Sequence, residues 1–280
     1  MVTSLRLATL NLFSGRALTD GRCDPDRIAA AVAGLDADVL ALQEVDRDQP
    51  RSGGVDQAAL VARAAGAVTH RFVPLVAGTP GRPGWTPADP HADPDPGSAA
   101  LSGPAYGIAL VSRRPVRSWH VLPLHPPRGR WPIPVPSRPP QLLWIADEPR
   151  AVVAAVLAEP RVVVAGTHLS FVPGANVRQL RRARAWLTAL AADAGAPLVL
   201  LGDLNLPGRL PARITGWTPL VTGPTFPAPR PRVQVDHVLA RGLRPAALRA
   251  ARVVELPFSD HRAAVVDLDL PSGHPDRPNT

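Results

Sequence analysis

The stretch LVLLGDLNL, Leu198–Leu206, shows the pattern on which a fold prediction can be built. Its first part, Leu198–Leu201, is a continuous apolar run of the kind found in strands that are buried on both faces. The run stops at Gly202, and Asp203 and Asn205 follow at once. Both residue types favour turns, so a plain turn is one interpretation. At the end of a buried strand they are also well placed to serve a functional site.

Other apolar runs end in residues that can bind a metal ion or transfer a proton: Leu5–Leu10 before Asn11, Val39–Leu42 before Glu44, and Val162–Gly166 before His168. The pair Asp260–His261 stands just before a further run, Ala263–Leu270. Buried strands that deliver polar groups to one rim are the usual way in which an α/β scaffold builds a site. We therefore expect these residues to gather at one edge of the fold.

Helix signals separate several of these runs. Asp24 is a good N-cap with Pro25 at the first helical position, and apolar residues recur after it at helical spacing. Further helices are predicted across Val55–Ala65 and Val177–Ala194, and further strands at 108–112, 151–157 and 233–239. The order is too irregular for a doubly wound sheet. It predicts an α/β (α+β) domain with strands enough for two sheets.

The length of 280 residues and the 45% apolar content allow one or two domains with a sizeable core. We expect a single domain over residues 1–270. Pro and Gly crowd the segments Thr79–Pro104 and Pro123–Pro140, which we interpret as surface loops or insertions. The last residues, Pro271–Thr280, are predicted to be a disordered tail.

Several classes of protein are excluded by composition. No hydrophobic run reaches the roughly 18 to 20 residues that span a bilayer, because Arg, Asp or Pro interrupts each run first. Met1–Leu10 lacks the pattern of a signal peptide, so we expect a cytoplasmic protein with no transmembrane segment. Cys23 is the only cysteine, which rules out a disulfide framework and a cysteine zinc cluster. Any metal must bind carboxylates, histidine or asparagine.

The formal net charge is +8, and all 31 basic residues are arginines. Arginine suits the recognition of phosphate. The abundance of Ala, Arg, Pro and Gly is also explained by base composition in the coding DNA, so the charge favours an anionic partner only slightly.

The candidate residues suit one kind of chemistry. Glu44 and Asp260 are hard oxygen ligands of the type that Mg²⁺ or Mn²⁺ prefers. His168 and His261 can exchange protons near neutral pH, and Asp236 could orient one imidazole and stabilise its charged form. The two asparagines named above add neutral hydrogen bonds. Together these groups fit the attack of water on a phosphate ester while a cation neutralises the developing charge.

Seven segments in order resemble the endonuclease/exonuclease/phosphatase superfamily, which includes deoxyribonuclease I, exonuclease III, bacterial sphingomyelinases and inositol polyphosphate 5-phosphatases. They are LATLNLFSG around Asn11, DVLALQEVD around Glu44, YGIALVSRRPV at 106–116, VVVAGTHLS around His168, LVLLGDLNL around Asp203, VQVDHVL around Asp236, and FSDHRAAVVDL around His261. The resemblance covers nearly the whole chain. It implies a deoxyribonuclease I-like four-layer sandwich of two packed mixed β-sheets flanked by helices, with the site at one edge of the sheets.

The resemblance also implies roles for the metal and the attacking water. Glu44 would be the principal metal ligand, and Asn11 and Asp260 would help to hold metal or phosphate. Asp203 and Asn205 would position the water and stabilise the pentacovalent phosphorus.

The histidines follow the same resemblance. His261, oriented by Asp236, would act as base or phosphate clamp, and His168 would bind phosphate or assist the leaving oxygen. In deoxyribonuclease-like members the residue matching His168 is paired with a glutamate, and residues 70–80 hold no counterpart. Arg51 in RSGGVDQ and Arg150 in PRAVVAAV either contact substrate phosphate or form structural salt bridges.

We therefore expect a monomeric, Mg²⁺- or Mn²⁺-dependent phosphoesterase that hydrolyses a phosphodiester by in-line attack of water. The charge favours nucleic acid slightly, and phospholipid or sphingomyelin and inositol phosphates are the alternatives. Against an abasic-site endonuclease, Pro229–Gln234 holds no aromatic pocket residue. A rival hypothesis is a non-catalytic, arginine-rich binder of nucleic acid or phospholipid, but every matched catalytic position is retained.

Overall fold

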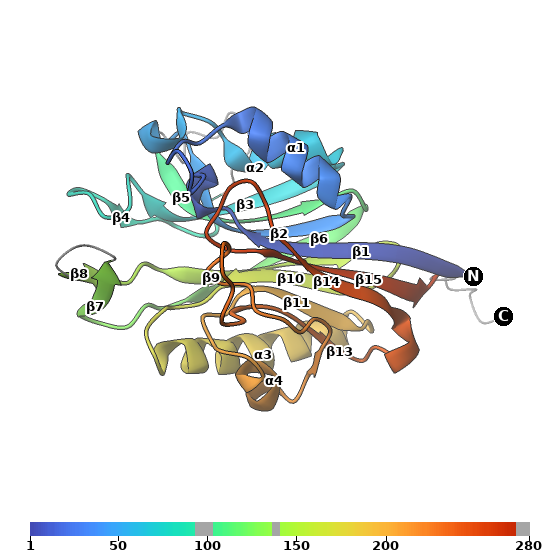
Figure 1. Ribbon diagram of the computed structural model, residues 1–280. Helices are drawn as coiled ribbons and strands as arrows, with labels where there is room; N and C mark the ends of the chain where they lie inside the picture. The colour runs from blue at the N-terminus through green and yellow to red at the C-terminus, as the bar shows by residue number, and fades with distance from the viewer. Residues whose placement is uncertain (93–102, 136–140, 273–280) are drawn as a thin grey trace.

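The computed structural model describes residues 1–92, 103–135 and 141–272, which form two packed β-sheets between two pairs of helices (Figure 1). The first sheet has seven strands in the order β14 (Leu248–Val254), β15 (Ala263–Pro271), β1 (Val2–Asn11), β2 (Val39–Arg47), β5 (Ala105–Ser112), β3 (Thr69–Ala77) and β4 (Thr86–Pro87). The second has six, in the order β12 (Thr218–Pro219), β13 (Asp236–Arg241), β11 (Leu198–Asp203), β10 (Val163–His168), β9 (Arg150–Leu157) and β6 (Val116–Leu124).

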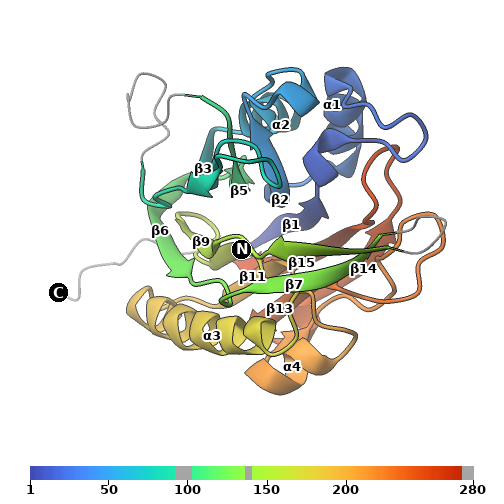
Figure 2. The same ribbon diagram turned by 90° about the vertical axis from the view of Figure 1, so that its left-hand side faces the viewer.

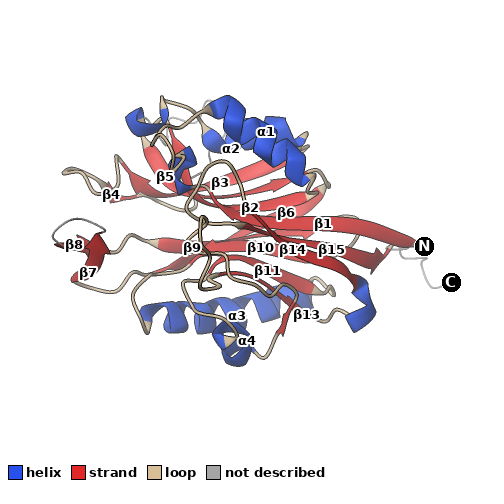
Figure 3. Ribbon diagram, in the orientation of Figure 1, coloured by secondary structure: helices blue, strands red, loops and turns tan. Residues whose placement is uncertain are grey.

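Helices cover the outer face of each sheet (Figure 3). The helices α1 (Pro25–Leu35) and α2 (Gln57–Ala65) pack on the first sheet, and α3 (Ala175–Asp193) and α4 (Leu210–Thr215) pack on the second. Three short 3₁₀ turns lie at Phe13–Gly15, Pro50–Ser52 and Pro245–Ala247. The predicted four-layer sandwich of two mixed sheets is confirmed.

The continuous apolar runs are explained by burial on both faces of each sheet. In β2, Val39 and Ala41 face the core between the sheets, whereas Leu40 and Leu42 face the core beneath α1 and α2. The alternation repeats in β11, whose side chains divide between the central core and the core beneath α3. Each central strand therefore needs apolar residues at every position.

The helix boundaries follow local signals. The Asp24 carboxylate accepts hydrogen bonds from the Asp26 and Arg27 amides, and Pro25 opens α1, as predicted. The predicted second helix begins two residues later than expected, because Asp56 acts as its cap. No helix in the described part of the chain is long and apolar enough to cross a membrane.

The structure differs from the prediction of a loop at 123–140. Strand β6 extends to Leu124, and β7 (Arg130–Val135) pairs with β8 (Gln141–Ala146) in a separate two-stranded ribbon. Each strand of such a ribbon has one free edge, where prolines that lack an N–H are tolerated. In the predicted loop 79–104 only the two-residue β4 is regular, and residues 93–102 and 136–140 lie outside the described part. Pro271 of the predicted tail ends β15, and 273–280 also lie outside it.

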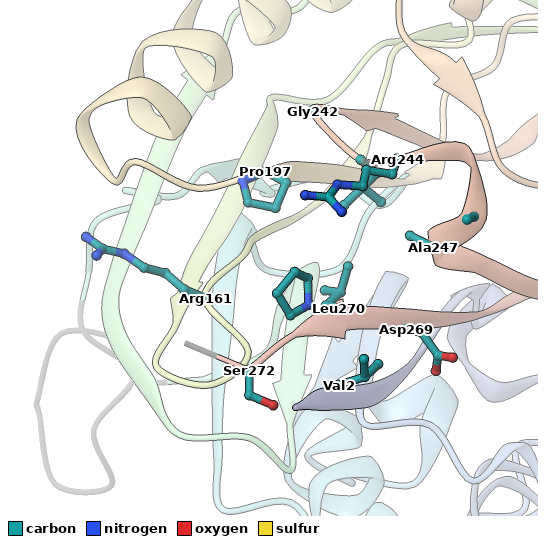
Figure 4. Close-up of a pocket in the computed structure, with 12 residues that line it drawn as sticks. Val2, Arg161, Pro197, Gly242, Arg244, Ala247, Asp269, Leu270 and Ser272 are labelled. Atoms are coloured by element: carbon teal, nitrogen blue, oxygen red, sulfur yellow. The ribbon is translucent and has the colours of Figure 1, made fainter. Parts of the chain in front are cut away.

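The directions of the strands distinguish the two ends of the sandwich. Strands β1 and β2 are parallel, and so are β10 and β11, so their carboxyl ends lie at one edge. The opposite edge carries a pocket of about 590 Å³ (Figure 4), which is lined by residues such as Val2 and Pro197 at the starts of β1 and β11. The residues predicted to form the site lie at the other edge.

Candidate active site

Four predicted residues occupy the ends of strands at this edge. Asn11 is the last residue of β1, His168 the last of β10 and Asp203 the last of β11. Asp236 is the first residue of the antiparallel β13, and its pairing register sets it directly opposite Asp203. The topology therefore brings residues from distant parts of the sequence to one place.

Glu44 reaches the site through an irregularity in β2. The sequence suggested a strand that ends at Leu42, but β2 continues to Arg47, and its pairing with β5 shifts between Leu42 and Val45. Glu44 lies in this bulge with a left-handed φ of 54°. Bulges of this kind redirect a side chain and are common beside active sites.

Gly202 allows β10 and β11 to pair closely beside the site. A Cβ atom at this position would lie 2.0 Å from the Thr167 carbonyl oxygen, and the φ of 148° is one that other residues rarely adopt. The glycine in GDLN therefore has a structural reason, since any side chain would separate the two strands that carry His168 and Asp203.

Asn11 connects the two sheets at the site. Its Nδ2 donates to Glu44 Oε1 at 3.1 Å and to Asp203 Oδ2 at 3.3 Å, while its Oδ1 accepts from the Phe13 amide at 3.0 Å. Asn11 is fully buried. It fixes the spacing between a carboxylate of the first sheet and a carboxylate of the second.

His261 forms a buried pair with Asp236. The distance from His261 Nδ1 to Asp236 Oδ2 is 2.9 Å, and His261 Nε2 lies 3.8 Å from Asp203 Oδ2. Burial acts to lower the pKa of His261, but Asp236 and Asp203 outweigh it and raise the pKa to about 10. The imidazole is therefore a cation at neutral pH in the metal-free protein.

His168 has the opposite electrostatic environment. Its Nε2 lies 3.3 Å from Asn205 Nδ2 and 3.5 Å from Asp203 Oδ2. Burial, together with the positive charges of Arg150 and His261, holds the pKa of His168 well below its usual value. His168 is therefore neutral at neutral pH.

The carboxylates carry charge that the described side chains compensate only in part. Burial raises the pKa of Glu44 to about 7 and that of Asp203 to about 6, and Asp260 adds to the first shift. Burial also raises the pKa of Asp260, whose Oδ1 is buried and has no hydrogen-bond partner among the described residues. Uncompensated buried carboxylates of this kind fit a divalent cation.

A second set of groups could also hold a metal ion. Asp203, Asp236 and His261 each bring one potential ligand atom to within 4.8 Å of the others. Asp236 and His261 of this group already form the imidazole–carboxylate pair.

The two predicted arginines both have ion-pair partners. Arg51 contacts the fully buried Asp46 through Nη2 at 2.6 Å and Nε at 2.9 Å. Arg150 is itself buried, and its guanidinium lies 2.8 Å from Asp147 and 2.9 Å from Glu148. These pairs favour the structural alternative for both arginines, although Arg150 lies near enough to lower the pKa of His168.

Sequence reasoning missed two hydroxyl groups that support the site. Ser259 Oγ donates to the Asn11 carbonyl oxygen at 2.6 Å and accepts from the His261 amide at 3.0 Å. Thr225 Oγ1 accepts from the Asp236 amide at 3.2 Å. Ser259 stands directly before Asp260, so its place in FSDHR was an available signal, whereas no pattern marked Thr225.

The fold and site geometry together define a two-sheet sandwich with an acid-rich, histidine-bearing centre at one edge. Residues 8–261 match the Endonuclease/Exonuclease/phosphatase family, and the chain belongs to this family. Members of the family hydrolyse phosphoester bonds and generally use a divalent metal. No curated protein matches the sequence significantly.

Solved structures with the same fold cover nearly the whole chain. An endonuclease/exonuclease/phosphatase from Beutenbergia cavernae is 27% identical with a TM-score of 0.65, over 95% of this chain and 72% of that one. Sphingomyelinase C from Streptomyces griseocarneus is 20% identical with a TM-score of 0.56, over 95% and 99%. A mannosyl-6-phosphatase from Bacteroides thetaiotaomicron is 14% identical with a TM-score of 0.61, over 94% and 98%. The last two show the similarity of the fold alone.

Proposed function

We propose that the protein is a divalent-metal-dependent phosphodiesterase that cleaves its substrate by in-line attack of water. The observation that carries the proposal is the position of Asn11, which holds Glu44 of one sheet and Asp203 of the other beside the His261–Asp236 pair. A metal-binding carboxylate, a proton acceptor and a cation are thereby gathered in one place, as phosphoester hydrolysis requires.

Glu44, with Asn11 and Asp260, would hold Mg²⁺ or Mn²⁺. The orphaned Asp260 Oδ1 and the raised pKa of Glu44 support this assignment, because the first is a buried acceptor without a partner among the described residues and the second reflects a carboxylate that is buried beside Asp260. When bound, the ion would neutralise charge on the phosphate as it develops in the transition state.

Asp203 and Asn205 would orient the attacking water. Asp203 Oδ1 accepts from the Asn205 amide at 2.9 Å, which fixes the carboxylate. Burial raises the pKa of Asp203 to about 6, and a carboxylate with a pKa near neutral is a better proton acceptor than an ordinary one.

Both histidines would bind the phosphate group of the substrate. His261, held as a cation by Asp236, would bind a phosphate oxygen by charge, which is the clamp role and not the base role. Neutral His168 and the side-chain amide of Asn205 would supply hydrogen bonds to another oxygen or to the leaving group.

Two observations bear on the substrate, and they favour different substrate classes. The net charge of +8 and the four exposed arginines of α3 (Arg178, Arg181, Arg182 and Arg184) slightly favour nucleic acid. The alternatives are phospholipid or sphingomyelin and inositol phosphates. Phospholipid is favoured by the large apolar side chains that β7 and β8 expose.

Hydrolysis of a panel of phosphodiesters tests the proposal. Plasmid DNA, RNA, sphingomyelin and bis(p-nitrophenyl) phosphate would each be assayed with Mg²⁺, Mn²⁺ or EDTA. We expect metal-dependent cleavage that Asp203→Ala abolishes and that Asp193→Ala, an exposed position on α3, leaves unchanged. If no substrate is cleaved, and the protein binds anions in a way that salt weakens and EDTA does not affect, the result would instead support a non-catalytic binder.

A further inference from the structure

The ribbon formed by β7 and β8 exposes large apolar side chains. Leu142 is 62% exposed, Leu143 55%, Trp144 55% and Trp131 36%, whereas side chains of these types are usually covered. Adjacent residues of a strand point to opposite faces, so Leu142 and Leu143 make both faces of the ribbon apolar. The ribbon belongs to neither large sheet. An isolated hairpin gains little stability from exposed apolar groups, so their concentration here indicates a surface for a partner.

The ribbon projects from the edge of the sandwich that carries the candidate site. In Figure 1 it extends beyond the body of the protein, and in Figure 2 β7 crosses in front of the edge where the strands end. The segment that leads into β7 is held at this edge by Gln179. Its Nε2 donates to the His125 carbonyl oxygen at 3.1 Å, and its Oε1 accepts from the Ser170 amide at 2.8 Å. Ser170 is two residues beyond His168.

The segment that follows β8 also leads to the site. Strand β8 is followed directly by Asp147 and Glu148, which hold Arg150 at the start of β9. Strand β9 pairs with β10, and Val152 lies opposite Thr167, the residue before His168, so the base of the ribbon lies beside the strand that ends at the candidate site. A partner that binds the ribbon would therefore lie against the site.

The charged residues of the ribbon and of the segment before it are all positive. Between residues 125 and 146 the charged residues are all arginines, namely Arg128, Arg130 and Arg138. Arg138 lies outside the described residues, whereas Arg128 and Arg130 are exposed, and Arg130 Nε donates to the Trp144 carbonyl oxygen at 3.2 Å across the ribbon. Tryptophan, leucine and arginine together suit the interface of a membrane, where indole rings lie at the headgroup level and basic residues attract anionic lipid.

We propose that the β7–β8 ribbon docks the protein on a phospholipid surface that contains anionic lipid, with Trp131, Leu142, Leu143 and Trp144 entering the interface. Single-stranded nucleic acid, which would also use tryptophan and arginine, is disfavoured because the two exposed leucines have no π-face on which a base could stack. The further step, that a headgroup phosphodiester then enters the site, rests on the proposed function.

Vesicle sedimentation in EDTA tests the docking without any contribution from turnover. The full-length protein would be mixed with vesicles of phosphatidylcholine with or without phosphatidylglycerol. The ribbon variant is Leu142→Ser/Leu143→Ser/Trp144→Ser, and the matched control is Leu18→Ser/Val68→Ser, at apolar positions that are 49% and 66% exposed elsewhere on the surface. We expect binding that phosphatidylglycerol strengthens, that the ribbon variant weakens by about tenfold or more, and that the control retains.

Circular dichroism would establish that the ribbon variant is folded. A second variant, Arg128→Gln/Arg130→Gln, should remove the preference for phosphatidylglycerol while retaining part of the binding. Absence of vesicle binding by the wild-type protein, or equal binding by the ribbon variant, would overturn the proposal. So would ribbon-dependent binding to single-stranded DNA that competes with vesicles. Vesicle binding without hydrolysis of any substrate would support docking and count against the proposed catalytic function.

Discussion

Asp236 Oδ2 lies 2.9 Å from His261 Nδ1, and this pair joins the two sheets at the candidate site. Asp236 opens β13 of the second sheet, whereas His261 precedes β15 of the first. The carboxylate is fully buried, and its other oxygen has no hydrogen-bond partner among the described residues. Its interaction with the imidazole is therefore what compensates it, so the two groups form a buried ion pair.

Replacing Asp236 should change the charge of its partner. In Asp236→Asn we expect the pKa of His261 to fall from about 10 toward its ordinary value, because burial then acts without the opposing carboxylate. Turnover should decrease by roughly 10²- to 10⁴-fold. NMR titration of the His261 ring in the metal-free protein measures the first effect. A His261 pKa that stays near 10 would show that Asp203 and Asp260 maintain it without Asp236. His120→Gln serves as an activity control outside the site.

Divalent metal should stabilise the protein as well as activate it. Binding to the native state alone raises the melting temperature, by roughly 5 °C or more at a metal concentration about 100 times Kd. Thermal unfolding with Mg²⁺, Mn²⁺ or EDTA measures the shift. Glu44→Gln should abolish most of it, whereas Glu255→Gln, an exchange of an exposed residue, should not. A shift that Glu44→Gln leaves intact would move the metal to the Asp203, Asp236 and His261 group.

The contribution of Glu44 to the stability of the metal-free protein should fall as the pH rises from about 4.5 to 7. The pKa of Glu44 is raised from 4.5 to about 7, so the folded state binds more protons than the unfolded state across this window. The associated stabilisation is present below pH 4.5 and is lost as the pH passes through 7, with roughly 3 kcal/mol as an upper limit. Asp203 acts in the same direction at lower pH, because its pKa is raised to about 6.

Urea unfolding in EDTA at several pH values tests this dependence. The free energy of unfolding of the wild type should decrease relative to that of Glu44→Gln as the pH rises from about 4.5 to 7, because the amide does not titrate. Parallel curves for the two proteins would show that Glu44 is not the group responsible.

The central strands and the residues of the candidate site could be named from sequence because most of them follow a strong local signal. Val39–Leu42 and Leu198–Leu201 are buried on both faces and are therefore apolar throughout. The edge strand Leu248–Val254 was not predicted because much of it is exposed, and its sequence LRAARVV shows neither alternation nor a continuous apolar run. The ribbon was missed for another reason, since prolines at 132 and 134 usually mark loops.

The contacts among the candidate site residues could not be predicted from sequence. The bulge that places Glu44 depends on pairing with β5, more than 60 residues away, and no feature of QEVD predicts it. The ion pair between Arg51 and Asp46 is equally a product of tertiary structure. Local patterns identify strand ends, whereas the choice of partner depends on how the two sheets pack.

Gly202→Ala should be strongly destabilising. The added Cβ would meet the Thr167 carbonyl oxygen, and backbone of a neighbouring strand cannot move aside cheaply. We expect a loss of roughly 3 kcal/mol or more, against about 1 kcal/mol for Gly195→Ala, where φ is also positive but no atom lies within 4 Å of the Cβ. Urea denaturation compares the two. Equal losses would mean that β10 and β11 can separate without penalty.

A double-mutant cycle can decide between the two roles of Arg51. Arg51→Met alone leaves Asp46 buried and unpaired, so we expect a loss of roughly 3 to 5 kcal/mol of stability. Arg51→Met/Asp46→Asn should recover much of this loss, because no unpaired charge remains. If the arginine is structural, the double variant should also have nearly wild-type KM for a soluble phosphodiester. A KM that stays several-fold higher in the restored protein would mean that the Arg51 guanidinium contacts substrate phosphate in addition to Asp46.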